Sequence, residues 1–112
     1  MSEISWEDFE KVAVRVGKIT EAEPFPEARK PAYKLVVDFG EGLGTKNTSA
    51  QITKHYEPEG LIGKLVVAVV NFPPKRIAGF KSEVLVLGAP DEDGEVVLLG
   101  PDLSVPLGGR MF

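Results

Sequence analysis

The chain has 112 residues, of which 43% are hydrophobic, and it carries a net charge of −4. This length suits one domain with a single core and leaves no room for a second. The lack of cysteine excludes disulfides, thiol nucleophiles and thiolate metal sites, and no apolar run approaches the ~20 residues that span a bilayer. Because the N-terminus is acidic rather than basic, we expect a cytoplasmic protein without membrane insertion.

The first part of the chain predicts a short helix and then strands. Ser5 can cap a helix that runs to about Lys11. Residues 12–19 read as a long strand, and the apolar alternation changes phase after Gly17, which predicts a bulge or bend at this glycine. Strict alternation over residues 33–39 predicts a second strand. The glycine-rich residues 40–44 predict a hairpin turn after it.

The middle of the chain continues with a polar strand. Residues 45–52 (TKNTSAQI) hold few core side chains, so this strand lies at a sheet edge or offers a polar face to a partner. Residues 53–59 predict a helical turn that Pro58 and Gly60 end. Further strands are expected at residues 65–70, 83–87 and 96–99, with a turn at 91–94. These short strands, with little helix, predict an all-β fold: a five-stranded Greek-key barrel of the OB type, with a short N-terminal helix and a helical turn before the fourth strand.

A stiff basic connection lies between two of the predicted strands. Pro73 and Pro74 restrict the backbone, so Phe72 is held extended and Lys75 and Arg76 are presented with little freedom to lose on binding. This pattern is typical of a binding loop. The alternative is a surface turn with solvated charges.

The charge is distributed unevenly along the chain. Residues 28–84 hold nine basic and five acidic residues, whereas the remainder holds four basic and twelve acidic ones. A basic region on an acidic protein favours a polyanionic partner through counterion release. The alternative is that the linear block does not form a surface patch.

The composition argues against catalysis. His55 is the single histidine and there is no cysteine, so few groups remain for acid–base or nucleophilic chemistry. The acidic residues 91–95 lack the spacing of a calcium loop and read as a solvated turn. We therefore expect no catalytic residues, no metal and no cofactor.

The candidate binding residues are cations interspersed with amides and hydroxyls. Cations suit RNA phosphates, and the other groups suit 2′-hydroxyls or bases. Two aromatic residues, Phe72 and Phe80, could stack on bases, line a groove for an extended peptide, or belong to the core. The predicted RNA-binding residues are Lys30, Lys34, Lys46, Asn47, Ser49, Gln51, Lys54, Lys75, Arg76, Lys81 and Ser82.

Three segments together resemble a known family. They are FEKVAVRVGKITEAEPFPEA, TSAQITKHYEPEGLIGKLVVAVVNFPPKRIAGFKSEVLVLG and the closing PDLSVPLGGRMF. The chain resembles the tRNA-binding-domain family, which includes the C-terminal module of methionyl-tRNA synthetases and endothelial monocyte-activating polypeptide II. Within this family it is most similar to the CsaA-type export-related chaperones.

The resemblance implies a single OB-fold domain over residues 1–112 that forms a homodimer through its terminal segments and has no enzymatic activity. It implies a chaperone for export-bound or unfolded polypeptides with a tRNA-binding surface; the alternative is a protein that binds mainly tRNA or other structured RNA. Residues 82–85 read Ser-Glu-Val-Leu, where the tRNA-binding modules commonly read S-[QE]-G-M, and this departure favours the chaperone type. The RNA-facing residues that it carries over are Lys30, Asn47, Ser49, Lys75, Arg76, Lys81 and Ser82.

Overall fold

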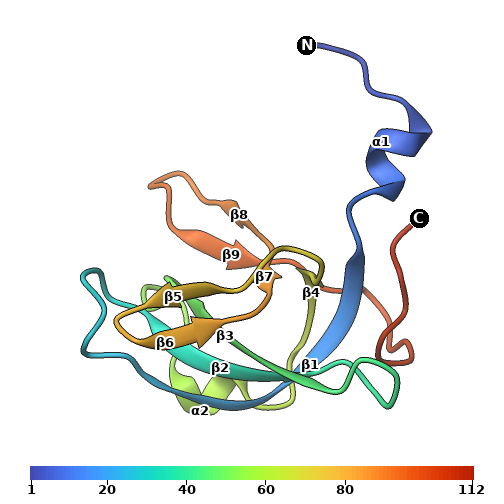
Figure 1. The fold of residues 1–112 in the computed structure, drawn as a ribbon. Helices are drawn as coiled ribbons and strands as arrows, with labels where there is room; N and C mark the ends of the chain where they lie inside the picture. Colours follow the sequence, from blue (N-terminus) through green and yellow to red (C-terminus); the bar gives the residue numbers. More distant parts are fainter.

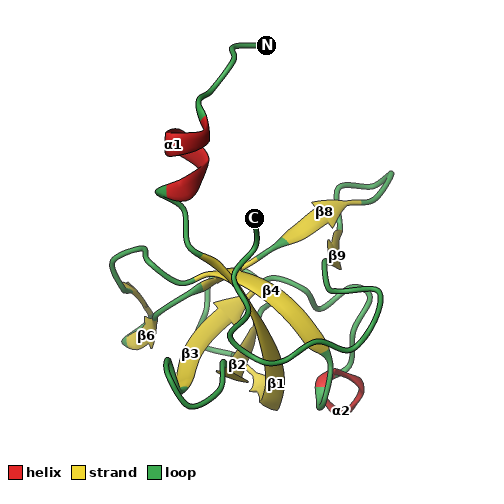
Figure 2. Ribbon diagram, turned by 90° about the vertical axis from the view of Figure 1, so that its right-hand side faces the viewer, coloured by secondary structure: helices red, strands yellow, loops and turns green.

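One antiparallel sheet forms the body of the protein. The computed structural model describes all 112 residues, and the sheet has five strands in the order β3-β2-β1-β4-β7 (Figures 1 and 2). Its strands are β1 (Val14–Pro24), β2 (Tyr33–Asp38), β3 (Thr45–Ala50), β4 (Leu65–Val69) and β7 (Leu85–Val86). The sheet curls until its two edges meet, which confirms the predicted five-stranded barrel.

The two edges of the sheet meet along a short seam between β3 and residues 82–84. The Glu83 amide donates to the Asn47 carbonyl over 2.8 Å, and the Asn47 amide donates to Oε1 of Glu83 over 3.0 Å. The Ser49 amide donates to Oγ of Ser82 over 3.2 Å. Because two of these three bonds end on side chains, the seam depends on the identity of residues 82 and 83 as well as on the backbone.

Alternating apolar residues from the strands fill the barrel. Residues of β2 alternate between buried and half-buried, as the strict pattern in the sequence predicts. The buried polar group is Thr48, whose hydroxyl donates to the Val84 carbonyl over 2.7 Å, so its burial leaves no unsatisfied donor. The core consists of Ile19, Tyr33, Leu35, Val37, Phe39, Ile52, Leu61, Val66, Ala68, Val84 and Leu98.

The structure moves the predicted bulge in β1. The register with β2 shifts between Ile19 and Glu21 rather than at Gly17. Gly17 instead faces the packed interior, where a Cβ atom would lie 2.5 Å from Cγ1 of Val37. Val14 and Val16 are buried but lie outside the core cluster, and their backbone bonds to the C-terminal segment. The apolar phase therefore changes because the two halves of β1 bury opposite faces, and no bulge occurs at Gly17.

Both helices are short and lie before strands. Ser5 caps α1 (Trp6–Glu10) in a capping box, as expected. The second helix, α2 (Pro58–Leu61), precedes β4, but it starts at Pro58, whereas the sequence predicts a helical turn that ends there. Proline suits the first turn of a helix because its missing amide has no partner there. Neither helix has the length and apolar character needed to cross a membrane.

Two small hairpins stand on the barrel. One pairs β5 (Lys75–Ile77) with β6 (Phe80–Ser82), and the other pairs β8 (Gly88–Pro90) with β9 (Val96–Leu98). Sequence reasoning treated the first as a connecting turn. Its strands read KRI and FKS, so each is short and interrupted by charge, and no apolar run reveals it.

The two ends of the chain lie next to each other. The C-terminal segment runs beside the start of β1. The Met111 amide donates to the Val14 carbonyl over 2.9 Å, and the backbones of Arg15 and Arg110 form an isolated antiparallel β-bridge. Figure 1 shows α1 standing away from the barrel near this segment. The termini therefore form an arm outside the packed core.

Candidate functional site

The outer face of β3 carries the polar side chains that the sequence singled out. Thr48 points into the barrel and is buried, whereas Asn47 and Gln51 are exposed and Ser49 is half-buried. Successive side chains of a strand point to opposite faces, so Asn47, Ser49 and Gln51 share the outer face. The sheet thus presents amides and a hydroxyl to the surface.

The β5–β6 hairpin is anchored by its second strand. The Phe80 ring packs edge-on against Phe25 with 5.4 Å between centroids. Nζ of Lys34 lies 4.8 Å from the Phe25 centroid and 5.3 Å from that of Phe80, and it is 3.9 Å from a carboxylate oxygen of Glu27. Ser82 is held by the seam. These contacts leave β5 free to present its cations.

Two cations face each other across this hairpin. Arg76 is paired with Lys81 in the register of β5 and β6, and both are exposed. Like charges directly opposite each other destabilise a two-stranded ribbon. The Arg76 guanidinium reaches only the Gly79 carbonyl, over 3.3 Å. The pair therefore lowers the stability of the free protein and favours the binding of an anion.

Three adjoining hollows lie along this side of the barrel, and we call them together the basic band. The middle hollow shares Ser49 and Lys75 with the first and Lys30 and Gln51 with the third. The first, the Phe72 pocket, is lined by Ser49, Phe72, Pro73, Lys75, Ile77, Ser82, Glu83, Val84 and Leu85. The middle hollow adds Arg29 and Arg76, and the third adds Thr53, Lys54 and Glu95.

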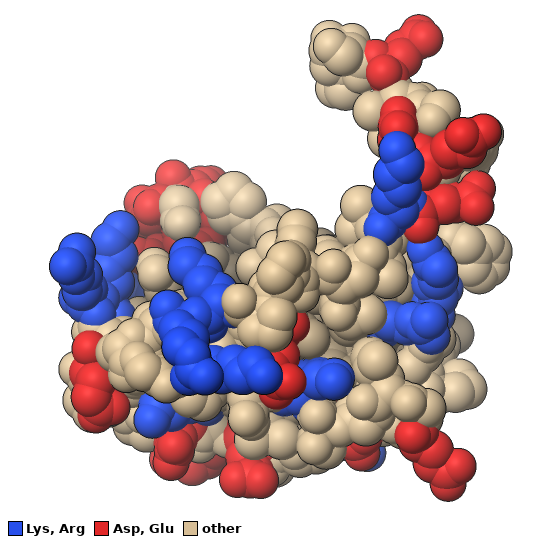
Figure 3. Space-filling view, viewed as in Figure 1, with Lys and Arg blue, Asp and Glu red and all other residues tan.

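Cations and acidic residues gather in different places on the face of the molecule that carries the band. Figure 3 shows Lys and Arg side chains gathered over β5 and β6, and acidic side chains on α1 and at the tip of the β8–β9 hairpin. Glu95 from that tip shares the third hollow with Lys30 and Lys54. The cations of the band therefore end at an acidic turn, and this turn repels a polyanion that extends beyond Lys54.

The single histidine holds the acidic turn in place. Nε2 of His55 lies 2.6 Å from Oδ2 of Asp91, and Oδ1 of Asp91 accepts the amides of Asp93 and Glu95 over 2.8 and 2.9 Å. The hydrogen bond from His55, together with those amides, lowers the pKa of Asp91. The His55–Asp91 pair thus joins the loop after β3 to the β8–β9 hairpin.

Two tyrosines attach the same hairpin to the core. The Tyr33 hydroxyl donates to the Tyr56 carbonyl over 2.7 Å, and the Leu98 amide donates to the Tyr56 hydroxyl over 2.9 Å. Burial raises the pKa of Tyr33, and the charges of Glu57 and Glu59 raise it further. This tyrosine therefore stays neutral and keeps its donated bond.

The structure brings most of the predicted binding residues together. Those that line the basic band are Lys30, Ser49, Gln51, Lys54, Lys75, Arg76, Ser82 and Phe72. Those outside the hollows are Lys34, Lys46, Asn47, Lys81 and Phe80. Among these, Lys34 and Phe80 take part in the contacts that anchor β6, while Lys81 is exposed beside Arg76.

Sequence reasoning missed Glu83 and Leu85 as lining residues. Leu85 is 49% exposed, whereas its neighbour Val84 is buried, so the Leu85 side chain lies on the outer face of the strand. A large apolar residue at an outward strand position is the signal that could have identified it. Glu83 carries no such signal, because its place depends on how the barrel closes.

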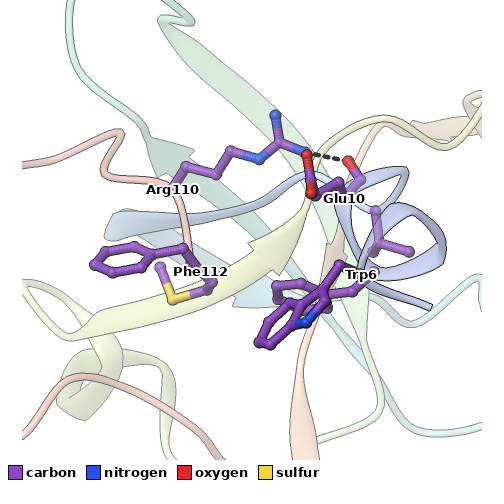
Figure 4. Close-up of a pocket in the computed structure, with 7 residues that line it drawn as sticks. Trp6, Glu10, Arg110 and Phe112 are labelled. Atoms are coloured by element: carbon purple, nitrogen blue, oxygen red, sulfur yellow. Dashed lines mark hydrogen bonds between the residues drawn. The ribbon is translucent and has the colours of Figure 1, made fainter. Parts of the chain in front are cut away.

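A second, apolar hollow lies between the two ends of the chain. Figure 4 shows Trp6 and Phe112 around it and Arg110 donating to the Glu10 carbonyl. Trp6 is 79% exposed and Phe112 is fully exposed. We call this surface the terminal groove. It is separate from the basic band, since the two share no lining residue.

Comparison with known proteins agrees with this geometry. Residues 14–110 match the family described as "Putative tRNA binding domain". The crystal structure of the chaperone CsaA from Bacillus anthracis is 58% identical, with a TM-score of 0.92 over 99% of this chain and 100% of that one. A MetRS-related protein from Pyrococcus horikoshii is 33% identical, with a TM-score of 0.87 over the full length of both chains.

Curated relatives include much longer enzymes. The chain is 42% identical to the methionine–tRNA ligase of Methanococcus aeolicus over 99% of its own length, and 38% identical to that of Porphyromonas gingivalis over 97%. It spans 16% of the length of each. The family match over residues 14–110 covers nearly the whole chain and includes every residue of the basic band. The chain therefore belongs to the tRNA-binding domain family, and CsaA is among its structural neighbours.

Proposed function

We propose that this chain is a non-enzymatic binding protein that holds tRNA or another structured RNA along the basic band. The observation that carries the proposal is the convergence of cations from three separate segments, around Lys30, Lys54 and Lys75, in adjoining hollows. The unrelieved Arg76–Lys81 pair points the same way, because an RNA phosphate would neutralise it.

The chemistry of the band suits RNA in two ways. Cations neutralise phosphates and release counterions, which supplies affinity without reading sequence. Ser49 and Gln51, which lie between these cations, offer a hydroxyl and an amide that can bond 2′-hydroxyls or base edges. The acidic turn at Glu95 limits how far the RNA backbone follows the band.

The test is charge reversal on β5. The double variant Lys75→Glu, Arg76→Glu should weaken tRNA binding at low salt by about tenfold or more and should flatten the dependence of affinity on salt. Lys18→Glu is the control, because Lys18 is exposed on β1 and lines none of the hollows of the band. Equal tRNA affinity in the wild type and the double variant would rule the band out.

A second candidate function is a CsaA-like chaperone that holds unfolded or export-bound polypeptides. It is favoured by the whole-chain similarity to the Bacillus anthracis chaperone CsaA and by the exposed apolar side chains of Phe72 and Leu85. Apolar burial survives screening by salt, whereas phosphate contacts do not. Capture of an unfolded test protein that persists at high salt and fails in Phe72→Ser would support this function; loss of capture at high salt would count against it.

We further propose that the protein acts as a homodimer in the cytoplasm, with the terminal groove as its interface. Trp6 and Phe112 are large apolar side chains left exposed on one arm, outside the core. A second copy presenting the same surface would bury them in a symmetric contact. This arrangement leaves the basic band of each copy free to bind RNA.

A further inference from the structure

We propose that the Phe72 pocket is a base-recognition subsite that accepts one unpaired nucleotide of the bound RNA, prefers a base with an exocyclic amino group, and disfavours uracil. The inference rests on the proposed RNA binding and adds selectivity to it. Adenine, cytosine and guanine carry such an amino group, and uracil does not.

The walls of the pocket suit a flat aromatic ligand. Phe72 is 54% exposed and Leu85 is 49% exposed, and both line the pocket together with Pro73. The proline that follows Phe72 restricts its backbone, so the backbone that carries the ring has little entropy left to lose on binding. A base stacked on such an aromatic side chain gains affinity whatever its identity, because every base has a π-face.

The polar groups of the pocket differ in what they can still bind. The hydroxyl of Ser82 is already engaged by the Ser49 amide and by Thr48. Oε1 of Glu83 accepts the Asn47 amide, and Oε2 of Glu83 has no hydrogen-bond partner within the protein. An ionised carboxylate only accepts hydrogen bonds. The free oxygen therefore suits an amino group and repels the carbonyl edge of uracil.

The same pocket contains a cation for the phosphate of the nucleotide. Lys75 lines both the Phe72 pocket and the middle hollow, so it stands where the pocket opens into the rest of the basic band. An apolar wall, an acceptor and a cation together match a base with its phosphate. A polypeptide is the poorer occupant, because the seam already uses the backbone of β3 at Asn47 and Ser49, so no strand can be added there.

The experiment compares cytosine with uracil, because both are pyrimidines and stack to a similar extent. Fluorescently labelled hexamers of cytidylate and uridylate are titrated with the wild-type protein at low salt, and binding is followed by anisotropy. We expect the cytidylate hexamer to bind about tenfold more tightly. Phe72→Ala should weaken both hexamers.

Glu83→Gln is the decisive variant. Its carboxamide oxygen can still accept the Asn47 amide, so the seam is retained, while its amide nitrogen becomes a donor. The preference for cytidylate should disappear or reverse toward uridylate. Glu41→Gln makes the same charge change at an exposed turn and should leave the preference intact. Should Glu83→Gln fail to fold, a cytidylate hexamer in which methyl groups replace both hydrogens of the cytosine amino group tests the same contact from the RNA side. This hexamer has no amino donor and should lose the preference over uridylate.

The outcomes separate this inference from the proposed function. Equal binding of the two hexamers, no hexamer binding while tRNA is still bound, or a preference that survives Glu83→Gln would overturn the subsite alone. A peptide that loses affinity in Phe72→Ala while the hexamers do not would assign the pocket to polypeptides and also overturn it. Failure to bind tRNA and both hexamers at low salt would instead refute RNA binding itself.

Discussion

Ala78 holds a backbone conformation that its side chain disfavours. It is the one non-glycine residue with positive φ, at 48°, and it forms the two-residue turn of the β5–β6 hairpin with Gly79. Asparagine is preferred at this position of such turns. Ala78→Asn should therefore raise the free energy of unfolding by about 0.5–1 kcal/mol, measured by denaturant titration. Ala89→Asn, at an exposed strand residue with ordinary φ, should give no gain; a gain of equal size there would contradict the explanation.

Asp91 should make the protein sensitive to acid. Its pKa lies below the ordinary value of 3.8 in the folded protein, so the folded state binds fewer protons than the unfolded chain near that value. The stabilisation is complete above this ordinary pKa and is lost as pH falls through the lowered pKa of the folded state. Thermal unfolding followed from about pH 5 to about pH 2 should show a steeper loss in the wild type than in Asp91→Asn. Parallel curves would show that this carboxylate plays no part.

The sequence predicted which residues lie in the site, but not which of their side chains are exposed and which are packed. Lys75 and Arg76 follow two prolines and are exposed, as that pattern indicates. Phe72 and Phe80 were indistinguishable in the sequence, but the structure leaves Phe72 exposed and packs Phe80 against Phe25. What separates them is the β1–β2 loop, a contact between segments far apart in the chain, which no local pattern contains.

The Arg76–Lys81 pair of the β5–β6 hairpin lowers stability and favours the binding of RNA. Replacing Lys81 by glutamate would place an acid opposite Arg76 and turn a repulsive cross-strand pair into an attractive one. Lys81→Glu should raise the free energy of unfolding by about 0.2–1 kcal/mol and at the same time weaken tRNA binding. Denaturant titration and a tRNA binding assay check the two effects. Lys18→Glu, which is exposed on β1 and outside the hollows of the band, serves as the charge-matched control for binding. A fall in stability in Lys81→Glu would show that the pair is not repulsive.

Strands that lie in apolar runs were predictable, whereas the charged strands of the β5–β6 hairpin were not. Tyr33–Asp38 alternates over a whole strand, and its burial pattern follows that alternation residue by residue. The strands of the β5–β6 hairpin have three residues each, and the turn between them holds Ala-Gly instead of the Asn-Gly that marks such hairpins. The start of α2 was misplaced for a related reason: proline can end one helix or begin the next, and only the backbone after Pro58 decides.

The terminal groove predicts how the whole molecule assembles. If the proposed interface is correct, Phe112→Ser should weaken self-association by about tenfold or more, because a large exposed apolar side chain is lost from the terminal groove. Sedimentation velocity checks this. Trp6 is the only tryptophan and lies in the same groove, so its emission should shift to shorter wavelength as the wild-type protein is concentrated.

The matched control is Phe72→Ser, which removes an exposed aromatic residue outside the terminal groove. It should associate like the wild type. A wild-type protein that sediments as a monomer at every concentration, or a Phe112→Ser variant that associates unchanged, would remove the terminal groove as the interface.

The seam that closes the barrel has a consequence for how binding and folding are coupled. Ser82 and Glu83 complete the hydrogen bonds of the seam and also line the Phe72 pocket. A ligand seated there contacts the barrel only when it is closed, so its binding energy is added to the stability of the closed form. The barrel can then open at the seam only when the ligand is released. Amide hydrogen exchange at Asn47 and Glu83 should therefore slow as the ligand concentration rises.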